Sequence, residues 1–436
     1  MEEGGRQILV SERERNNSDQ LKGDIRPAVL IKEGQIECQR CGSCFNKEEV
    51  QLPTGIHYCP ACIHYGRADT SKVFVTVSEQ SSVSFPKIHW PGPLTVFQKR
   101  ISQALVRNYQ QKKATLVWSV TGSGKTEMIF EVIQAARLQG HRVAVVSPRI
   151  DVCRELFPRI QQAFPKESCL LLYGDSEEDY RYTDLLVATI HQLLHFYRAF
   201  DLIIVDEVDA FPYEGDQQLR FGLMNALKAT GCLIYLSATP SDALLKETTN
   251  FAVEKMPLRF HQRPLIVPQL IWYEGWRNVY QTKRRLRCLL FHLQRLSQTN
   301  FVLVFCPSIV FMERLEKAVR SFLKEETITS VSAKDPARIE KVVKARNSKY
   351  QILFTTTILE RGVTFENVSV VVMGADHPVF SKSALVQIAG RVDRKGPFNH
   401  GEVLFFYDQA TSAIRKAILE IQAMNRLAKE WLASEV

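Results

Sequence analysis

A glycine-rich loop between a predicted strand and a predicted helix restricts the fold of this chain more than any other feature. The loop spans Ser119–Thr126, after the apolar run Ala114–Val120 and before the helical pattern Lys125–Gln139. Glycines let backbone N–H groups turn toward phosphates, and the helix N-terminus adds its positive end. We therefore expect a nucleotide-phosphate site here, and its binding residues would be Thr121, Gly122, Ser123, Gly124, Lys125 and Thr126.

From Leu94 onward, apolar runs alternate with helical patterns, which predicts an α/β fold of parallel sheets covered by helices. A proline-containing stretch, Pro257–Pro268, interrupts the alternation, which restarts with a helix expected around Thr282–Gln298. We therefore expect two α/β lobes, at residues 94–255 and 256–436. The expected strands are Ala114–Val120, Arg142–Val146, Cys169–Leu172, Leu185–Ala188, Leu202–Val205, Leu233–Leu236, Asn300–Phe305, Gln351–Thr355, Val368–Met373 and Glu402–Tyr407.

The second half of the nucleotide site is expected at Leu202–Asp209, where four apolar residues are followed by Asp-Glu-Val-Asp. A buried strand of this kind presents carboxylates at its carboxyl end, in the nucleotide crevice. Asp206 would hold Mg²⁺ together with Thr126, and Glu207 would orient and deprotonate the attacking water. The alternative is an acidic strand-to-loop junction without chemistry, which the preceding phosphate loop makes the poorer interpretation.

Five of the ten cysteines lie within 25 residues, in a segment that predicts a zinc site. Two C-x-x-C pairs separated by 17 residues have the spacing of a four-thiolate Zn²⁺ centre. Cys44 is the fifth cysteine, so the choice of four stays open, although Gly42 suits the tight turn of a zinc knuckle after the first pair. The set that we favour is Cys38, Cys41, Cys59 and Cys62.

The region before the lobes divides into three parts. Residues 1–35 lack an apolar period and are expected to form a flexible arm. Residues 36–66 would form the zinc module, and residues 67–93 a connector that includes the alternating strand pattern Lys72–Val77.

Composition and charge narrow the class of protein. Hydrophobic residues at 45% and charged residues at 24% exclude a largely disordered or fibrous chain. No apolar run approaches the ~20 residues of a membrane span, so we expect a cytoplasmic protein without an integral membrane segment. The net charge is +9, and Lys255–Asn300 holds nine basic residues against one acidic residue. This local excess suits a polyanion such as nucleic acid, with Lys283–Arg287 as a contributor; the alternative is a solvated basic face.

In chain order, these motifs resemble those of superfamily 2 helicases and translocases, whose two RecA-like lobes bind ATP between them. The resemblance implies that Gln98, in Leu94–Gln98, reads the adenine. It implies that Arg391 and Arg394 act as arginine fingers on the γ-phosphate, although Asp393 stands where relatives usually have glycine. The residues implied to couple hydrolysis to lobe closure are Ser237, Thr239 and Gln387, and those implied to contact nucleic acid are Arg149, Thr189, Ser308, Thr356 and Arg361.

The four-cysteine module in front of such a motor, with the Asp-Glu-Val-Asp form of Asp206–Asp209, is similar to the competence ATPase family ComFA of naturally transformable Gram-positive bacteria. The resemblance implies a motor that uses ATP, Mg²⁺ and Zn²⁺ and helps to pull single-stranded DNA across the cytoplasmic membrane. It implies partners such as the ComFC-like protein and other DNA-uptake proteins, and a place in the cytoplasm or at the inner face of the cell membrane. A homo-oligomer is compatible with the sequence.

Other functions stay open at this point. A replication-restart DNA helicase has similar motifs, but its cysteine ligands lie within the second lobe. An RNA helicase and a restriction-type translocase subunit are broader rivals. In a different class, a nucleotide-gated scaffold would bind DNA and partners with little ATP turnover; the intact set of charged motif residues argues against it.

Overall fold

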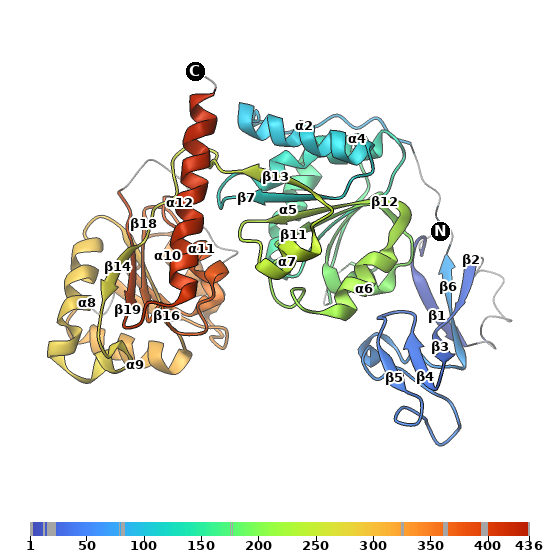
Figure 1. Cartoon of the computed structure of the whole chain (residues 1–436), viewed down its shortest axis with the longest axis horizontal. Coiled ribbons are helices and arrows are strands. Elements are labelled where there is room, and N and C mark those ends of the chain that lie inside the picture. The colour runs from blue at the N-terminus through green and yellow to red at the C-terminus, as the bar shows by residue number, and fades with distance from the viewer. Residues whose placement is uncertain are drawn as a thin grey trace. The chain divides into compact units, whose positions relative to one another are not determined.

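In a computed structural model, the chain is described over residues 3–11, 14, 23–77, 79, 83–174, 176, 178–323, 327–360, 365–393 and 400–434. It divides into two compact units, residues 1–118 with 125–255, and residues 119–124 with 256–436. Each unit holds one large sheet flanked by helices (Figure 1), which we call the first and second lobes. The predicted α/β fold with two parallel-sheet lobes is confirmed.

The first lobe is built on a seven-stranded sheet in the order β13-β7-β12-β11-β8-β10-β9. The pairs from β7 to β9 are parallel, and β8, β10 and β11 are buried at every position because helices cover both faces. The elements are α2 (Val96–Gln110), β7 (Thr115–Ser119), α3 (Lys125–Met128), α4 (Phe130–Arg137), β8 (Val143–Ser147), α5 (Ile150–Ala163), β9 (Cys169–Leu172), β10 (Leu185–Thr189), η2 (Ile190–His195), β11 (Phe200–Asp206), α6 (Gln217–Ala226), β12 (Leu227–Ser237), α7 (Asp242–Glu247) and β13 (Ala252–Met256).

The second lobe has a six-stranded parallel sheet in the order β14-β19-β18-β15-β17-β16. Its core packs α8 and α9 against the apolar strands, and α11 lies beside α12 (Figure 1). The elements are β14 (Gln269–Trp272), η3 (Trp276–Gln281), α8 (Lys283–Leu296), β15 (Phe301–Phe305), α9 (Ile309–Arg320), β16 (Ile328–Val331), α10 (Arg338–Arg346), β17 (Ile352–Thr355), η5 (Thr357–Leu359), β18 (Val368–Met373), α11 (Lys382–Ala389), β19 (Val403–Tyr407) and α12 (Ser412–Ala433).

The N-terminal region forms two small antiparallel sheets, β1-β6-β2 and β3-β4-β5. The segment expected to be a flexible arm contributes three of these strands, which the sequence analysis missed. Two of them, β1 and β2, pair with β6, which lies more than 40 residues further along the chain, whereas β3 pairs with the adjacent β4. The elements are β1 (Gln7–Ser11), β2 (Gly23–Pro27), β3 (Val29–Lys32), β4 (Gln35–Cys38), β5 (Cys44–Asn46), η1 (Ile63–Tyr65) and β6 (Lys72–Val77).

The N-terminal region and the first lobe share one continuous apolar core. Gln7 donates a side-chain hydrogen bond of 2.8 Å to the Leu194 carbonyl, and the Arg26 guanidinium stacks on the Tyr197 ring. The Arg142 side chain is fully buried and donates hydrogen bonds to Glu79 at 3.1 Å and to the Tyr180 hydroxyl at 2.9 Å. These contacts fix the cysteine-bearing region on the first lobe, which carries α3 and β11.

Candidate active site and metal centre

The phosphate loop connects the end of β7 to the start of α3, as the motif requires. Gly122 and Gly124 have φ of +80° and +77°, in the left-handed region that glycine adopts without steric cost. Ser123 and Thr126 are buried, and Lys125 opens the helix with its side chain 19% exposed. The loop therefore has the backbone geometry of a phosphate cradle.

The carboxylate of Asp206 lies beside the lysine of this loop. Lys125 Nζ is 3.7 Å from Asp206 Oδ1. Burial raises the pKa of the Asp206 carboxyl, and the positive charge of Lys125 opposes that rise. The two residues meet because β7 and β11 both flank β12 in a parallel sheet, so their carboxyl ends share one edge.

The predicted magnesium ligands have the donor chemistry that the ion prefers. Thr126 offers a hydroxyl and Asp206 a carboxylate, and Mg²⁺ takes oxygen ligands. The Thr126 hydroxyl accepts a hydrogen bond of 3.0 Å from Arg159 Nη1, and the same guanidinium pairs with Glu127 at 3.0 Å. The sequence analysis did not single out Arg159, because nothing in the α5 sequence signals a contact with the phosphate loop.

Glu207 follows Asp206 with a backbone that is unusual for its residue type. Its φ is +55°, and its backbone N–H donates a hydrogen bond of 2.9 Å to Asp206 Oδ1. Its carboxylate Oε2 lies 3.9 Å from Arg149 Nε. Arg149 was predicted to contact nucleic acid, so the structure brings a candidate DNA residue to the candidate water-activating residue.

The two hydroxyls predicted to couple hydrolysis to lobe motion share one acceptor. Ser237 donates a hydrogen bond of 2.8 Å to Asp209 Oδ1, and Thr239 donates one of 2.7 Å to Asp209 Oδ2. All three side chains are buried. The sequence analysis included Asp209 only as part of the acidic motif. It did not predict that the Asp209 carboxylate accepts hydrogen bonds from Ser237 and Thr239.

The other candidate nucleic-acid residues of the described chain lie at the carboxyl ends of strands. Thr189 ends β10 in the first lobe. In the second lobe, Ser308 follows β15 and caps α9, where its hydroxyl accepts from the Phe311 N–H at 3.2 Å. Thr356 follows β17, the strand next to β15. Arg361 lies outside the described residues.

The structure describes the arginine-finger motif from Gln387 to Asp393. Gln387 is buried on α11, and Arg391 is buried just after this helix, with its Nε donating a hydrogen bond of 3.1 Å to the Glu360 carbonyl. Arg394 lies outside the described residues. Gln98 is also buried, and its side-chain oxygen accepts from the Thr95 N–H at 2.9 Å in a capping box that begins α2.

Asp393, the departure from the helicase pattern, has φ of +52°, in the region where glycine is the favoured residue. Aspartate is one of the few other residues that tolerate this conformation. Its carbonyl accepts a hydrogen bond of 2.7 Å from the buried Arg259, and its carboxylate pairs with Arg263 at 2.9 Å. The replacement therefore keeps the backbone shape and adds an ion pair within the second lobe.

The structure brings four cysteines together as the favoured ligand set. The sulfur atoms lie within 4.8 Å of one another, with two pairs at 3.6 Å. Tetrahedral zinc with bonds of ~2.3 Å places its sulfur ligands about 3.8 Å apart, so the cluster fits the ion. Cys44 is exposed and lies outside the cluster. The clustered residues are Cys38, Cys41, Cys59 and Cys62.

A buried arginine that the sequence analysis did not single out lies against this cluster. Arg40 Nη1 donates hydrogen bonds to the Gly66 carbonyl at 2.7 Å and the Cys62 carbonyl at 3.3 Å, and it lies 3.8 Å from the Cys62 sulfur. Its guanidinium also stacks on the Phe74 ring of β6. Four thiolates around Zn²⁺ carry a net charge of −2, so this cation suits the loaded site.

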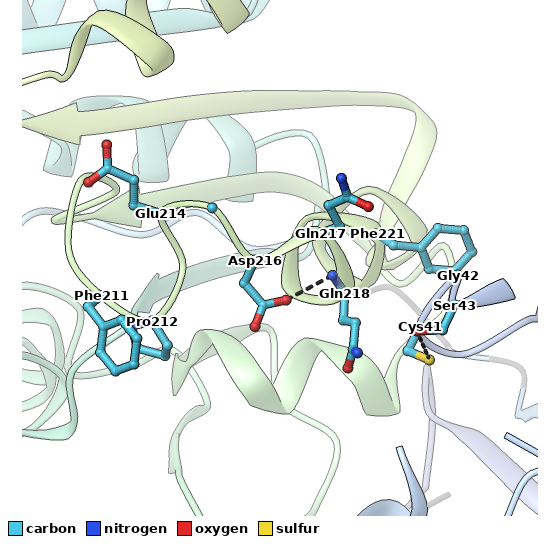
Figure 2. A pocket seen from close by; sticks show the side chains of 11 residues that line it. Cys41, Gly42, Ser43, Phe211, Pro212, Glu214, Asp216, Gln217, Gln218 and Phe221 are labelled. Carbon is cyan, nitrogen blue, oxygen red and sulfur yellow. Dashed lines mark hydrogen bonds between the residues drawn. The ribbon is translucent and has the colours of Figure 1, made fainter. Parts of the chain in front are cut away.

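The cysteine cluster packs directly on the segment that follows the acidic motif. Gly42 has φ of +70°, and a side chain at this position would meet the Phe221 ring of α6 at 2.4 Å. Asn225 of α6 donates a hydrogen bond of 3.1 Å to the Gln39 carbonyl. A pocket of about 700 Å³ lies between the turn at Cys41–Ser43 and the segment Phe211–Gln218, and Figure 2 shows the side chains that line it. The cysteine cluster is thus positioned against α6 and the segment that leads into it from the acidic motif.

Comparisons with known proteins give the family and the fold class of both lobes. Residues 93–242 match the family described as "Type III restriction enzyme, res subunit", and residues 282–396 match "Helicase conserved C-terminal domain". The solved structure of S. cerevisiae Dbp5 bound to RNA and ADP BeF3 shares the fold, with a TM-score of 0.54 and 15% identity over 76% of this chain and 91% of Dbp5. The helicase MrfA bound to DNA and AMPPNP has a TM-score of 0.54 and 14% identity over 78% of this chain and 54% of MrfA.

The fold and the matched families define an ATP-dependent helicase-type ATPase of superfamily 2, as predicted. Competence protein ComFA of Streptococcus pneumoniae is 41% identical over 96% of this chain and 97% of that protein. ComFA of Bacillus subtilis is 36% identical over 92% of this chain and 88% of that protein. The chain belongs to the ComFA family, which confirms the resemblance seen in the sequence.

In the part of the chain that the structure describes, no helix has both the length and the hydropathy that crossing a bilayer requires.

Proposed function

We propose that this ATPase is a motor that moves along single-stranded DNA and drives the uptake of transforming DNA across the cytoplasmic membrane. Membership of the ComFA family supports the process, and the excess of basic residues in Lys255–Asn300 supports the polyanionic substrate. The observation that carries the proposal is the meeting of Lys125, Asp206 and Glu207 at one sheet edge, with Arg149 in reach of Glu207. This arrangement joins candidate hydrolysis and DNA-binding groups directly.

In this proposal, Lys125 and the loop N–H groups hold the β- and γ-phosphates of ATP. Glu207 orients the attacking water and accepts its proton as the bond from the water oxygen to the γ-phosphorus forms, while the bond from the γ-phosphorus to the β–γ bridging oxygen breaks and ADP leaves. Thr126 and Asp206 would hold Mg²⁺, which neutralises phosphate charge when bound. From the resemblance, we assign Gln98 to the adenine.

The roles of the second lobe follow from the resemblance in the same way. We assign Arg391 to the transition-state charge on the γ-phosphate, and Gln387 to coupling. Ser308 and Thr356 would contact DNA, and their positions at strand ends support this role. Contact of Arg361 with DNA and contact of Arg394 with the γ-phosphate remain predictions from the resemblance.

The zinc module and the partners complete the proposal. We propose Zn²⁺ at the four clustered cysteines, where it would stabilise the N-terminal region and, through the shared core, the first lobe. A ComFC-like protein, other competence proteins and a position at the cytoplasmic face of the membrane are proposed from family membership.

A displacement assay tests the motor directly. Single-stranded DNA carries biotin at either end, and release of bound streptavidin is followed with ATP. We expect ATP-dependent release from one end, and none with Lys125→Ala. If ATP and DNA bind but streptavidin stays at both ends, the protein is a nucleotide-gated scaffold. If forked duplexes are unwound but single strands are not cleared, the replication-restart type of helicase is favoured.

A further inference from the structure

The ion pair between Arg149 and Glu207 links the proposed DNA-binding site to the proposed site of ATP hydrolysis. Arg149 follows β8 and Glu207 follows β11, and these strands are parallel neighbours with Leu202 opposite Val143 and Val205 opposite Val146. Their carboxyl ends therefore meet, and Arg149 Nε lies 3.9 Å from Glu207 Oε2. The contact is a consequence of the sheet topology.

The backbone conformation of Glu207 is set by a local hydrogen bond, and its carboxylate pairs with Arg149. The φ of +55° is costly for a residue with a side chain and is held by the hydrogen bond from its N–H to Asp206. A carboxylate drawn toward Arg149 is drawn away from other partners, including a water in line with the γ-phosphate. The arginine thus competes with the water for the same carboxylate.

The pair is weak enough to be broken by a competing anion. Its separation of 3.9 Å compares with 2.7 Å for Arg137 with Glu167 and 3.0 Å for Arg159 with Glu127 in the same lobe. The Arg149 side chain is 29% exposed, so an incoming phosphate can reach it. A guanidinium binds phosphate in a bidentate fork, and a DNA strand supplies phosphates at high local density.

We propose that Arg149 is a positioning residue that restrains Glu207 until a DNA phosphate takes the arginine away. Without DNA, the arginine holds the carboxylate off the attacking water. When a strand binds, Arg149 turns to its phosphate, and Glu207 is released to orient the water. This inference rests on the proposed DNA-dependent motor, and it assigns the DNA dependence of hydrolysis to one ion pair within the first lobe.

The variant Arg149→Gln tests this restraint in steady-state ATP hydrolysis with and without single-stranded DNA. Loss of one partly exposed ion pair should raise turnover without DNA about two- to fivefold. Turnover at saturating DNA should stay within about twofold of wild type, because the pair between Arg149 and Glu207 is absent in both proteins. The ratio of the two rates, which measures stimulation, therefore collapses. Arg149→Lys keeps the charge and should keep most of the stimulation.

Arg154→Gln is the matched control, since Arg154 lies on α5, the helix that Arg149 precedes, is exposed and donates to the Tyr173 hydroxyl. It should keep the wild-type ratio, and melting temperatures report whether each variant folds. If Arg149→Gln raises only the DNA concentration needed for half-stimulation, the residue is a simple DNA contact and the inference is wrong. It is also wrong if turnover falls both with and without DNA. Wild-type protein that DNA does not stimulate would instead contradict the proposed function.

Discussion

Thr239 donates a hydrogen bond of 2.7 Å to the carboxylate of Asp209, three residues after the proposed magnesium ligand. Both side chains are buried, and Ser237 bonds the other carboxylate oxygen. The loop after β11 is thereby tied to the loop after β12. A shift of the acidic motif during hydrolysis must move the Ser-Ala-Thr segment with it, which gives the predicted coupling motif a physical connection.

Removing this connection should uncouple the two loops. In Thr239→Val the Asp209 carboxylate loses a buried donor, so we expect a loss of about 1–3 kcal/mol in the free energy of unfolding and a lower DNA-stimulated turnover. Denaturant unfolding and ATP hydrolysis measure the two effects. Thr115→Val is the control, because its buried hydroxyl bonds only the Lys113 carbonyl among the contacts described, at 3.2 Å. Equal losses in both variants would show that the Asp209 bond has no special role.

The zinc site makes a prediction that separates neighbouring cysteines. Cys41→Ser should reduce bound zinc from about one equivalent to a small fraction, whereas Cys44→Ser should retain it. Because the cysteine region shares its core with the first lobe, metal loss should also lower the melting temperature of that lobe. Metal analysis and thermal unfolding test both statements. Retention of zinc by Cys41→Ser would show that Cys44 replaces it as a ligand.

Arg40 should strengthen zinc binding through its hydrogen bonds and its charge. Arg40→Met is expected to weaken zinc affinity about 10- to 100-fold, as measured by competition with a chelator. Arg67→Met provides a control from the same module, since Arg67 is half-exposed and pairs with Asp69, which keeps its hydrogen bond from the Ser71 hydroxyl. Unchanged affinity in Arg40→Met would mean that the arginine only packs on Phe74.

The start of α8 carries a cluster of exposed basic residues, Lys283, Arg284, Arg285 and Arg287, and its first turn holds no acidic residue. Positive charge at a helix N-terminus opposes the helix dipole, so these residues do not stabilise the helix. Neutralising Arg284 and Arg287 to Gln should lower DNA affinity and reduce the salt slope by about one unit per lost phosphate contact. The same change at Lys344 and Arg346 of α10 is the control. An equal slope in both variants removes α8 from the DNA path.

Local sequence patterns predicted the strands that are mostly apolar and buried, wherever they lie in the sheet. The runs at Cys169–Leu172 and Val368–Met373 match the edge strand β9 and the inner strand β18 to the residue. The edge strands β13, β14 and β16 were missed, since each mixes polar or charged residues with apolar ones, as in Ala252–Met256. The expected helix Lys125–Gln139 forms as two helices, α3 and α4.

The site was predictable where a motif is contiguous and unpredictable where a contact is made by distant residues. Lys125 and Asp206 were assigned from local signatures, and the structure places them 3.7 Å apart. The contact of Arg159 with Thr126 and that of Arg40 with Cys62 depend on which elements pack together. Asp393 shows a third case, because its departure from glycine is explained only by the backbone conformation that it adopts.

The most direct test of the central claim is steady-state ATP hydrolysis by the full chain without polymer and with single-stranded DNA, duplex DNA or RNA. A DNA motor with the proposed site should be stimulated most strongly by single-stranded DNA, and Lys125→Ala should abolish turnover under every condition. Negligible turnover with any polymer, in protein that binds nucleotide, would contradict the motor. Stimulation by RNA alone would contradict the proposed substrate.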